Sequence, residues 1–270
     1  MGSEAWWSEA KVARGKTMAG DRIWRDLPEG FTTWAEREHM VAVRADAAAD
    51  PNLKDLLNGR SDGGEESRFH GRAKLSVLRM ENGAGALVRR YCHGGALRYL
   101  TGDIFVTWPP RPFKELAITE EARRRGVPTV EILAAGIDRI WGPLYRGWLV
   151  TRELEGARDL WAVLQEGSCA KTALLQAVAH ALQRMHRQGI YHGDLNLKNI
   201  LIRREGDDLK AYIIDFDKAV FFPGGVPAAK ARRNLARLRR SIAKLDPETR
   251  YLSPGEWEEF VGFYREDAAR

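Results

Sequence analysis

The pattern of hydrophobic and polar positions predicts a β-hairpin in the first half of the chain. Two short runs of mainly apolar residues, Ala73 to Arg79 and Ala86 to Tyr91, flank a turn sequence at Glu81 to Gly83. This arrangement is typical of a hairpin, because Asn-Gly readily adopts the turn that joins two antiparallel strands. A further short apolar run at 148–150 predicts another strand.

Helical spacing of apolar positions follows in two places. Between Phe113 and Arg125 they recur every three or four residues, and the sequence Gly126 to Pro128 ends the predicted helix. A longer amphipathic helix is predicted around Leu174 to Met185, ending near Gly189. The chain therefore mixes strands and helices.

Two short apolar strands after the long helix lie next to polar residues. Ile200 to Ile202 follows the polar sequence Tyr191 to Asn199, and Ala211 to Ile214 leads into Asp215. Acidic or amide side chains thus lie next to one end of each strand.

The order of these elements predicts an α+β fold with a small antiparallel-sheet N-lobe and a mainly helical C-lobe. We expect residues 59–153 to form the N-lobe and residues 154–270 the C-lobe. Residues 1–58 are expected to form an irregular, peripheral leader of unknown role, because they are rich in aromatic residues without regular spacing.

Composition narrows the class of protein. A chain of 270 residues that is 44% hydrophobic can bury a sizeable core. No run of eighteen apolar residues occurs, and Cys92 and Cys169 cannot build a disulfide framework or a cysteine zinc site. We expect a cytoplasmic protein. The net charge of +6 favours a polyanionic partner without choosing between nucleic acid, nucleotide and anionic lipid.

The clearest chemical signal surrounds Asp194. Asn199 lies five residues after it, and a hydrophobic strand ends on Asp215-Phe216. In protein kinases this pattern supplies a carboxylate at the acceptor hydroxyl and oxygen ligands for magnesium. The sequence therefore predicts a protein-kinase-like phosphoryl-transfer centre that uses ATP and Mg²⁺.

Simpler interpretations of these residues exist. Asp194 and Asn199 can cap helices, and Asp215 can merely terminate a strand. His186 and His192 are six residues apart, which does not match the spacing of two helical zinc ligands. We therefore interpret both histidines as hydrogen-bonded scaffold.

Nucleotide binding requires a basic residue from the N-lobe. Arg89, in the second hairpin strand, stands where protein kinases have their phosphate-binding lysine, and Glu115 is its expected partner. Gly71 and Arg72 are expected to form a turn over the phosphates. Arg90 and Lys74 are the alternatives for the basic residue. Glu120 and Glu121 are the alternatives for its acidic partner.

A family resemblance rests on several of these motifs together. They are His192 to Asn196 with Asn199 to Leu201, Ile214 to Lys218, Arg89 to Tyr91 followed by Gly94-Gly95, Gly126 to Pro128, and Asn234 to Ser241. From about Phe69 to Leu245 the chain resembles the lipopolysaccharide kinases of Gram-negative bacteria, and among them the kinases of 3-deoxy-D-manno-octulosonic acid (Kdo).

The resemblance implies transfer of the ATP γ-phosphate to the 4-hydroxyl of Kdo on a lipid A precursor. It places the protein at the cytoplasmic face of the inner membrane, in lipopolysaccharide core synthesis. It implies that Asp194 is the catalytic base and that Asn199 and Asp215 hold the metal. Asn196 stands where protein kinases have a lysine, and Lys198 is expected to approach the transferred phosphate.

Two features after Asp215 favour an acceptor other than a protein. Only 55 residues remain, without the Ala-Pro-Glu sequence that closes a protein-kinase activation segment. Residues 228–245 then carry seven Lys or Arg and no acid, with apolar residues on one helical face. Such a helix can face an anionic membrane surface, or it can be an ordinary packed helix with a solvated basic side. No nucleic-acid partner is expected, because no recognised binding fold accompanies these charges.

Two further functions remain open on the sequence alone. An atypical protein kinase or an aminoglycoside-type phosphotransferase would use Asp194 and Asp215 on another acceptor. A pseudokinase binding module is the alternative outside enzymes, favoured by Arg89 in the place of a lysine and opposed by the intact acidic residues.

Overall fold

The computed structural model describes residues 27–36, 38–58, 75–93 and 102–266. The chain divides into two compact units. Unit 1 comprises residues 1–117 and 132–151, and unit 2 comprises residues 118–131 and 152–270. Each unit has its own hydrophobic core.

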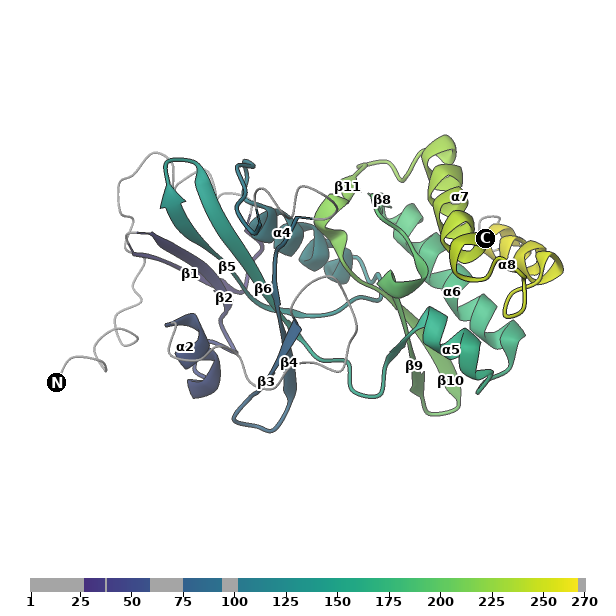
Figure 1. Ribbon diagram of the computed structural model, residues 1–270, viewed down its shortest axis with the longest axis horizontal. Helices are drawn as coiled ribbons and strands as arrows, with labels where there is room; N and C mark the ends of the chain where they lie inside the picture. The colour runs from purple at the N-terminus through teal and green to yellow at the C-terminus, as the bar shows by residue number, and fades with distance from the viewer. Residues whose placement is uncertain (1–26, 37, 59–74, 94–101, 267–270) are drawn as a thin grey trace. The chain divides into compact units, whose positions relative to one another are not determined.

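Unit 1 is built on a six-stranded sheet with the strand order β1-β2-β5-β6-β4-β3 (Figure 1). The strands are β1 (Phe31–Glu36), β2 (His39–Arg44), β3 (Leu75–Arg79), β4 (Gly85–Arg90), β5 (Ile132–Trp141) and β6 (Leu144–Arg152). The predicted hairpin is confirmed: β3 and β4 are antiparallel, with Leu75 opposite Arg89. Gly83 in the turn has a φ of +81°, a conformation that glycine adopts without steric cost.

The expectation of an irregular leader is wrong for residues 31–57. This segment forms β1, β2 and the helix α2 (Pro51–Leu57), and β2 pairs with the central strand β5. Met40 and Ala42 are buried in one core cluster of unit 1, and Val43 in another. Strand β2 is therefore covered on both faces and belongs to the sheet.

Helix α4 (Arg111–Arg124) corresponds to the predicted helix at 113–125. Phe113 and Leu116 are buried in the core of unit 1. Gly126 follows the helix with a φ of +75°, and the Val127 N–H donates to the Ala122 carbonyl at 2.9 Å. This left-handed glycine ends the helix, as the sequence predicted.

Unit 2 is mainly helical. Its helices are α5 (Leu160–Glu166), α6 (Lys171–Arg187), α7 (Ala228–Leu245) and α8 (Pro254–Glu266). Its strands are β7 (Arg158–Asp159), β8 (Ile190–Tyr191), β9 (Ile200–Glu205), β10 (Asp208–Ile213) and β11 (Val220–Phe221). Two short 3-10 helices, η1 (Leu197–Asn199) and η2 (Phe216–Lys218), follow β8 and β10. The predicted long helix and the two strands at 200–202 and 211–214 are confirmed; α8 was not predicted.

The core of unit 2 fixes the segments that carry the polar motifs. Leu182 and Met185 of α6 pack in one buried cluster with Ile200 and Ile213, the paired ends of β9 and β10. Phe216 is fully buried in the same cluster. The loops before β9 and after β10 are thus attached to a common apolar base.

No helix in the described ranges combines the length and the apolar character that crossing a bilayer requires.

Candidate active site

The loop from His192 to Asn199 joins β8 to β9, and a buried histidine fixes its shape. The Asp194 N–H donates to His192 Nδ1 at 3.1 Å, so this nitrogen is an acceptor and Nε2 carries the proton. Nε2 donates to the Ile214 carbonyl at 2.9 Å. Burial lowers the pKa of His192, which keeps the ring neutral. The predicted scaffold role of His192 is therefore confirmed.

The three predicted acidic and amide residues come together through the backbone. Asn199 Nδ2 donates to the Asp194 carbonyl at 3.0 Å, and the Ile214 N–H donates to the Asn199 carbonyl at 3.0 Å. Asp215 has a φ of +66°, which is uncommon for a residue other than glycine. Such strained conformations concentrate at functional sites.

Asn199 and Asp215 have the donor atoms that a magnesium ion requires. The Asn199 side-chain nitrogen is used by the Asp194 carbonyl, which leaves the amide oxygen for a cation. Asp215 adds a carboxylate. Within the described residues no group of three or more His, Cys, Asp or Glu is placed to hold a metal. Two protein oxygens completed by water and substrate phosphates are a typical Mg²⁺ environment in kinases.

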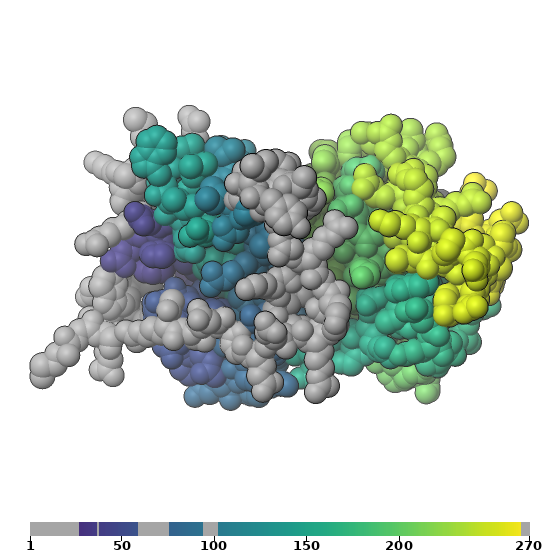
Figure 2. Space-filling model, viewed as in Figure 1, coloured from purple at the N-terminus to yellow at the C-terminus, as the bar shows by residue number. Residues whose placement is uncertain are grey.

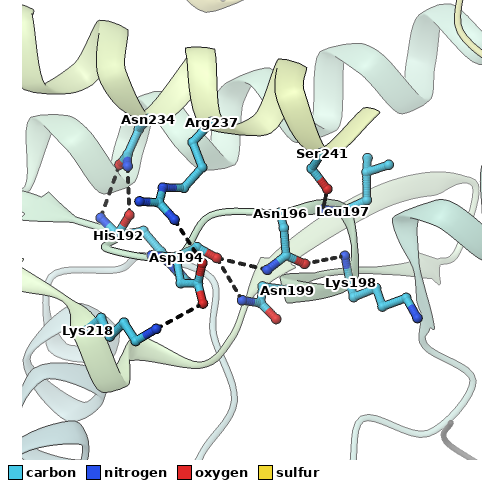
Figure 3. Close-up of polar contacts among 10 residues, drawn as sticks. All are labelled: His192, Asp194, Asn196, Leu197, Lys198, Asn199, Lys218, Asn234, Arg237 and Ser241. Atoms are coloured by element: carbon cyan, nitrogen blue, oxygen red, sulfur yellow. Dashed lines mark hydrogen bonds and ion pairs between the residues drawn. The ribbon is translucent and has the colours of Figure 1, made fainter. Parts of the chain in front are cut away.

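The Asp194 carboxylate lies between two cations (Figure 3). Arg237 Nη1, from α7, donates to Asp194 Oδ1 at 3.0 Å. Lys218 Nζ, from η2, lies 3.5 Å from Asp194 Oδ2. Sequence reasoning assigned neither side chain to the site, because both contacts depend on how α7 and η2 pack on the loop.

Helix α7 runs along the loop from His192 to Asn199 and holds it at two further points (Figure 3). Asn234 Oδ1 accepts from the His192 N–H at 3.1 Å, and Asn234 Nδ2 donates to the His192 carbonyl at 2.7 Å. Ser241 Oγ accepts from the Leu197 N–H at 3.4 Å. Asn234, Arg237 and Ser241 are three and four residues apart and so share one helical face. The sequence analysis used this segment only as part of the family resemblance and assigned no contact to it.

Gly193 explains why this loop approaches η2 so closely. A Cβ atom at Gly193 would lie 2.1 Å from the Lys218 carbonyl oxygen, closer than any real contact. A side chain at this position would push apart the two segments that place Lys218 beside Asp194.

Lys198 differs from the expectation in its direction. Its backbone N–H donates to Asn196 Oδ1 at 2.9 Å, while its exposed side chain points away from Asp194 (Figure 3). Asn196 Nδ2 donates to the Asp194 carbonyl at 2.9 Å, so Asn196 shapes the loop. The proposed contact of Lys198 with the transferred phosphate stays a prediction.

The expected ion pair in unit 1 is present. Arg89 Nη2 lies 2.6 Å and 2.5 Å from the two carboxylate oxygens of Glu115, and Tyr91 Oη also donates to Glu115. Glu115 is only 3% exposed. The alternative acids have other partners: Glu121 pairs with Arg124 and Arg125, and Glu120 with Arg123. Gly71, Arg72 and Lys74 lie outside the described residues.

The sequence of the chain is similar to those of known proteins. The profile of the lipopolysaccharide kinase (Kdo/WaaP) family matches residues 67–264. A protein of Actinobacillus succinogenes is 30% identical over 187 residues, which cover 68% of this chain and 76% of the relative. One from Xylella fastidiosa strain M12 is 32% identical over 220 residues, 80% of this chain and 74% of the relative. Both are named 3-deoxy-D-manno-octulosonic acid kinase.

A solved structure shares the fold. The structure titled "WaaP in complex with acyl carrier protein" superposes with a TM-score of 0.53 at 21% identity, covering 80% of this chain and 87% of that one. At this identity the likeness shows the fold alone. It confirms the predicted α+β, kinase-like class.

Proposed function

The chain belongs to the lipopolysaccharide kinase (Kdo/WaaP) family, and on this premise we propose that it transfers the γ-phosphate of ATP to a hydroxyl of Kdo on a lipid A precursor. The 4-hydroxyl is the acceptor that we propose. The observation that carries the proposal is the joint placement of Asp194, Asn199 and Asp215 on one hydrogen-bonded scaffold. The reaction would contribute to lipopolysaccharide core synthesis.

The chemistry follows from the positions of these side chains. The acceptor oxygen attacks the γ-phosphorus, the bond to the ADP oxygen breaks, and the proton of the hydroxyl passes to Asp194. Asn199 and Asp215 would hold Mg²⁺, which neutralises charge on the phosphate oxygens when it is bound. Arg89, held by Glu115, would anchor the nucleotide phosphates.

We propose a peripheral location at the cytoplasmic face of the inner membrane, because the acceptor is a lipid. Helix α7 supports this proposal. Its apolar residues Leu238 and Ile242 are buried in the core of unit 2, while several of its basic side chains remain exposed. In Figure 2, α7 lies at the surface of unit 2 in yellow-green.

Transfer of radiolabelled phosphate from ATP tests the proposed reaction. We expect label on a Kdo-bearing lipid A precursor, and none on a generic protein or an aminoglycoside. Asp194→Ala should lower transfer by roughly a thousandfold, since a positioned general base contributes about 10²–10⁴, while ATP binding is kept.

Asp208→Ala, which removes an exposed acid on β10, is the matched control and should retain activity. Label on protein alone would favour the protein-kinase alternative. Binding of ATP without transfer to any acceptor would favour a pseudokinase. Undiminished turnover of Asp194→Ala would contradict the role of this residue.

A further inference from the structure

Arg237 has hydrogen-bond donors beyond those that hold Asp194. Its Nη1 is engaged with the Asp194 carboxylate at 3.0 Å. Its Nε is buried and has no acceptor among the described residues. The buried Nε cannot itself reach a ligand, but 40% of the Arg237 side chain is exposed beside Asp194. The outer part of the guanidinium is therefore open to a group that arrives with the substrate. A guanidinium group offers paired donors that fit the two oxygens of a carboxylate or phosphate.

The position of Arg237 is set by the fold. Asn234, almost one turn earlier on α7, forms hydrogen bonds with both the backbone N–H and the backbone carbonyl of His192. Ser241, about one turn later, accepts from Leu197, and Leu238 is 2% exposed in the core. The guanidinium is therefore presented to the catalytic carboxylate by a helix that is fixed on both sides of it (Figure 3).

The charges around Asp194 leave a surplus. Arg237 and Lys218 both lie against this one carboxylate, so the three side chains together carry one net positive charge. A second cation is not needed to orient Asp194. Asp215 adds a negative charge to the same site, and we assign that charge to Mg²⁺. The positive charge of Arg237 and Lys218 beyond that of Asp194 then suits an anionic group that is bound next to the hydroxyl undergoing phosphorylation.

We infer that Arg237, assisted by Lys218, binds the carboxylate of an acidic sugar acceptor and so selects this class of substrate. The inference rests on the proposed function and deepens it, because a sugar acid carries such a carboxylate near its hydroxyls. Arg237 would hold Asp194 and the acceptor carboxylate at once, which fixes the acceptor hydroxyl relative to its base.

Steady-state kinetics with two matched, water-soluble acceptors test the inference. One is a methyl glycoside of Kdo, and the other is the same glycoside with its carboxylate converted to a carboxamide. The wild type should prefer the acid. Arg237→Gln should raise the KM for the acid roughly tenfold or more and remove the preference, because an unpaired polar group in a site discriminates strongly. The KM for ATP should not change.

Two further variants test whether the change in acceptor preference is specific to the guanidinium of Arg237. Arg232→Gln removes a charge from the opposite side of α7, five residues away, and should keep the preference for the acid. Arg237→Lys keeps the charge without the paired donors and should restore part of the preference. Thermal unfolding of each variant verifies that it is folded.

Other results would overturn the inference. An equal loss of kcat on both acceptors, with the acceptor KM unchanged, would assign Arg237 to Asp194 or to the transferred phosphoryl group. An effect seen only with the intact lipid precursor would assign it to the lipid A phosphates, which both glycosides lack. If the wild type phosphorylates neither the glycosides nor the lipid precursor, the proposed function itself fails. Transfer with the preference intact in Arg237→Gln contradicts the inference alone.

Discussion

At the scale of single residues, Arg89 is the residue that we predict in the place of the protein-kinase lysine, and the structure pairs it with Glu115. Its Nη2 contacts both oxygens of Glu115, and its guanidinium lies 4.9 Å from the centre of the Tyr91 ring. Glu115 is nearly inaccessible to solvent. Removing one partner of a buried ion pair leaves the other charge uncompensated, at a cost of about 3–5 kcal/mol.

Replacement of Arg89 should therefore affect both stability and nucleotide binding. Arg89→Ala should lower the free energy of unfolding by about 3 kcal/mol and weaken ATP binding. Arg89→Lys should retain most of both, because the charge is preserved. Denaturant unfolding and equilibrium nucleotide binding measure the two effects. Arg79→Ala, at an exposed position of β3, is the control. An unchanged ATP affinity in Arg89→Ala would transfer the anchoring role to Arg90 or Lys74.

The sequence pointed to candidate site residues where their local spacing matches a known chemical pattern, and the structure brings three of them together. Asp194, Asn199 and Asp215 were identified because their spacing follows the order of a loop and the strand after it. Arg237 and Lys218 were missed as partners of Asp194. Their contacts arise only when α7 and η2 pack against the loop, and no spacing along the chain encodes that packing.

At the scale of elements, a buried polar contact joins three helices of unit 2. His186 of α6 donates from Nε2 to Asn234 Oδ1 of α7 at 3.0 Å. Its Nδ1 accepts from Tyr264 Oη of α8 at 2.7 Å. Burial lowers the pKa of His186 to about 4 and raises the pKa of Tyr264 to about 12. The ring is therefore neutral in the folded protein at pH 7, consistent with its predicted scaffold role.

This contact predicts a loss of stability in mild acid. The pKa of His186 is lower in the folded state than the roughly 6.5 of an unfolded chain, so the unfolded state binds a proton first as the pH falls. Stability from this group is complete above about pH 6.5 and falls by roughly 3 kcal/mol down to about pH 4. Urea unfolding at several pH values measures the slope.

Variants separate His186 from other titrating groups. His186→Gln should flatten the slope between pH 6.5 and 4, although buried His192 contributes in the same direction in both proteins. Gln176→Ala, at an exposed position of the same helix, should keep the full slope. An identical slope in His186→Gln and the wild type would contradict this account.

Elements with a clear period were predictable, and those without one were not. Helix α6 was predicted from the helical spacing of its apolar residues, and the β3-β4 hairpin from the Asn-Gly sequence in its turn. Strand β2 reads Met-Val-Ala-Val at its centre, because both of its faces are buried and no polar alternation marks it. Its place in the sheet is decided by pairing with β5, nearly a hundred residues later.

At the scale of the whole molecule, the net charge is +6, and exposed basic residues are concentrated on α7. The apolar side of this helix is occupied by the core of unit 2, so it cannot enter a bilayer. Its exposed arginines can only act electrostatically, each contributing about 1 kcal/mol near an anionic surface. Such attraction is weakened by salt, because the Debye length falls to roughly 3 Å at 1 M.

Flotation with vesicles containing phosphatidylglycerol tests the membrane proposal. The wild type should float with the vesicles at low salt and dissociate as the salt concentration rises. A variant in which the exposed arginines are replaced by Gln should bind about a hundredfold more weakly, from about 1 kcal/mol per charge with partial screening. The residues are Arg232, Arg233, Arg239 and Arg240. Replacement by Lys is the charge-preserving control. Equal flotation of the Gln variant would leave α7 a structural helix.

The three contacts of α7 with the loop from His192 to Asn199 also limit how the length of the chain can vary. One residue inserted between Asn234 and Ser241 would rotate the rest of the helix by about 100°, and Asn234 and Ser241 could no longer face the loop together. An insertion before Pro227, ahead of the helix, changes no angle within it. Insertions and deletions should therefore be tolerated before α7 but not within it. Substitutions of side chains on the outer surface of α7 should be tolerated.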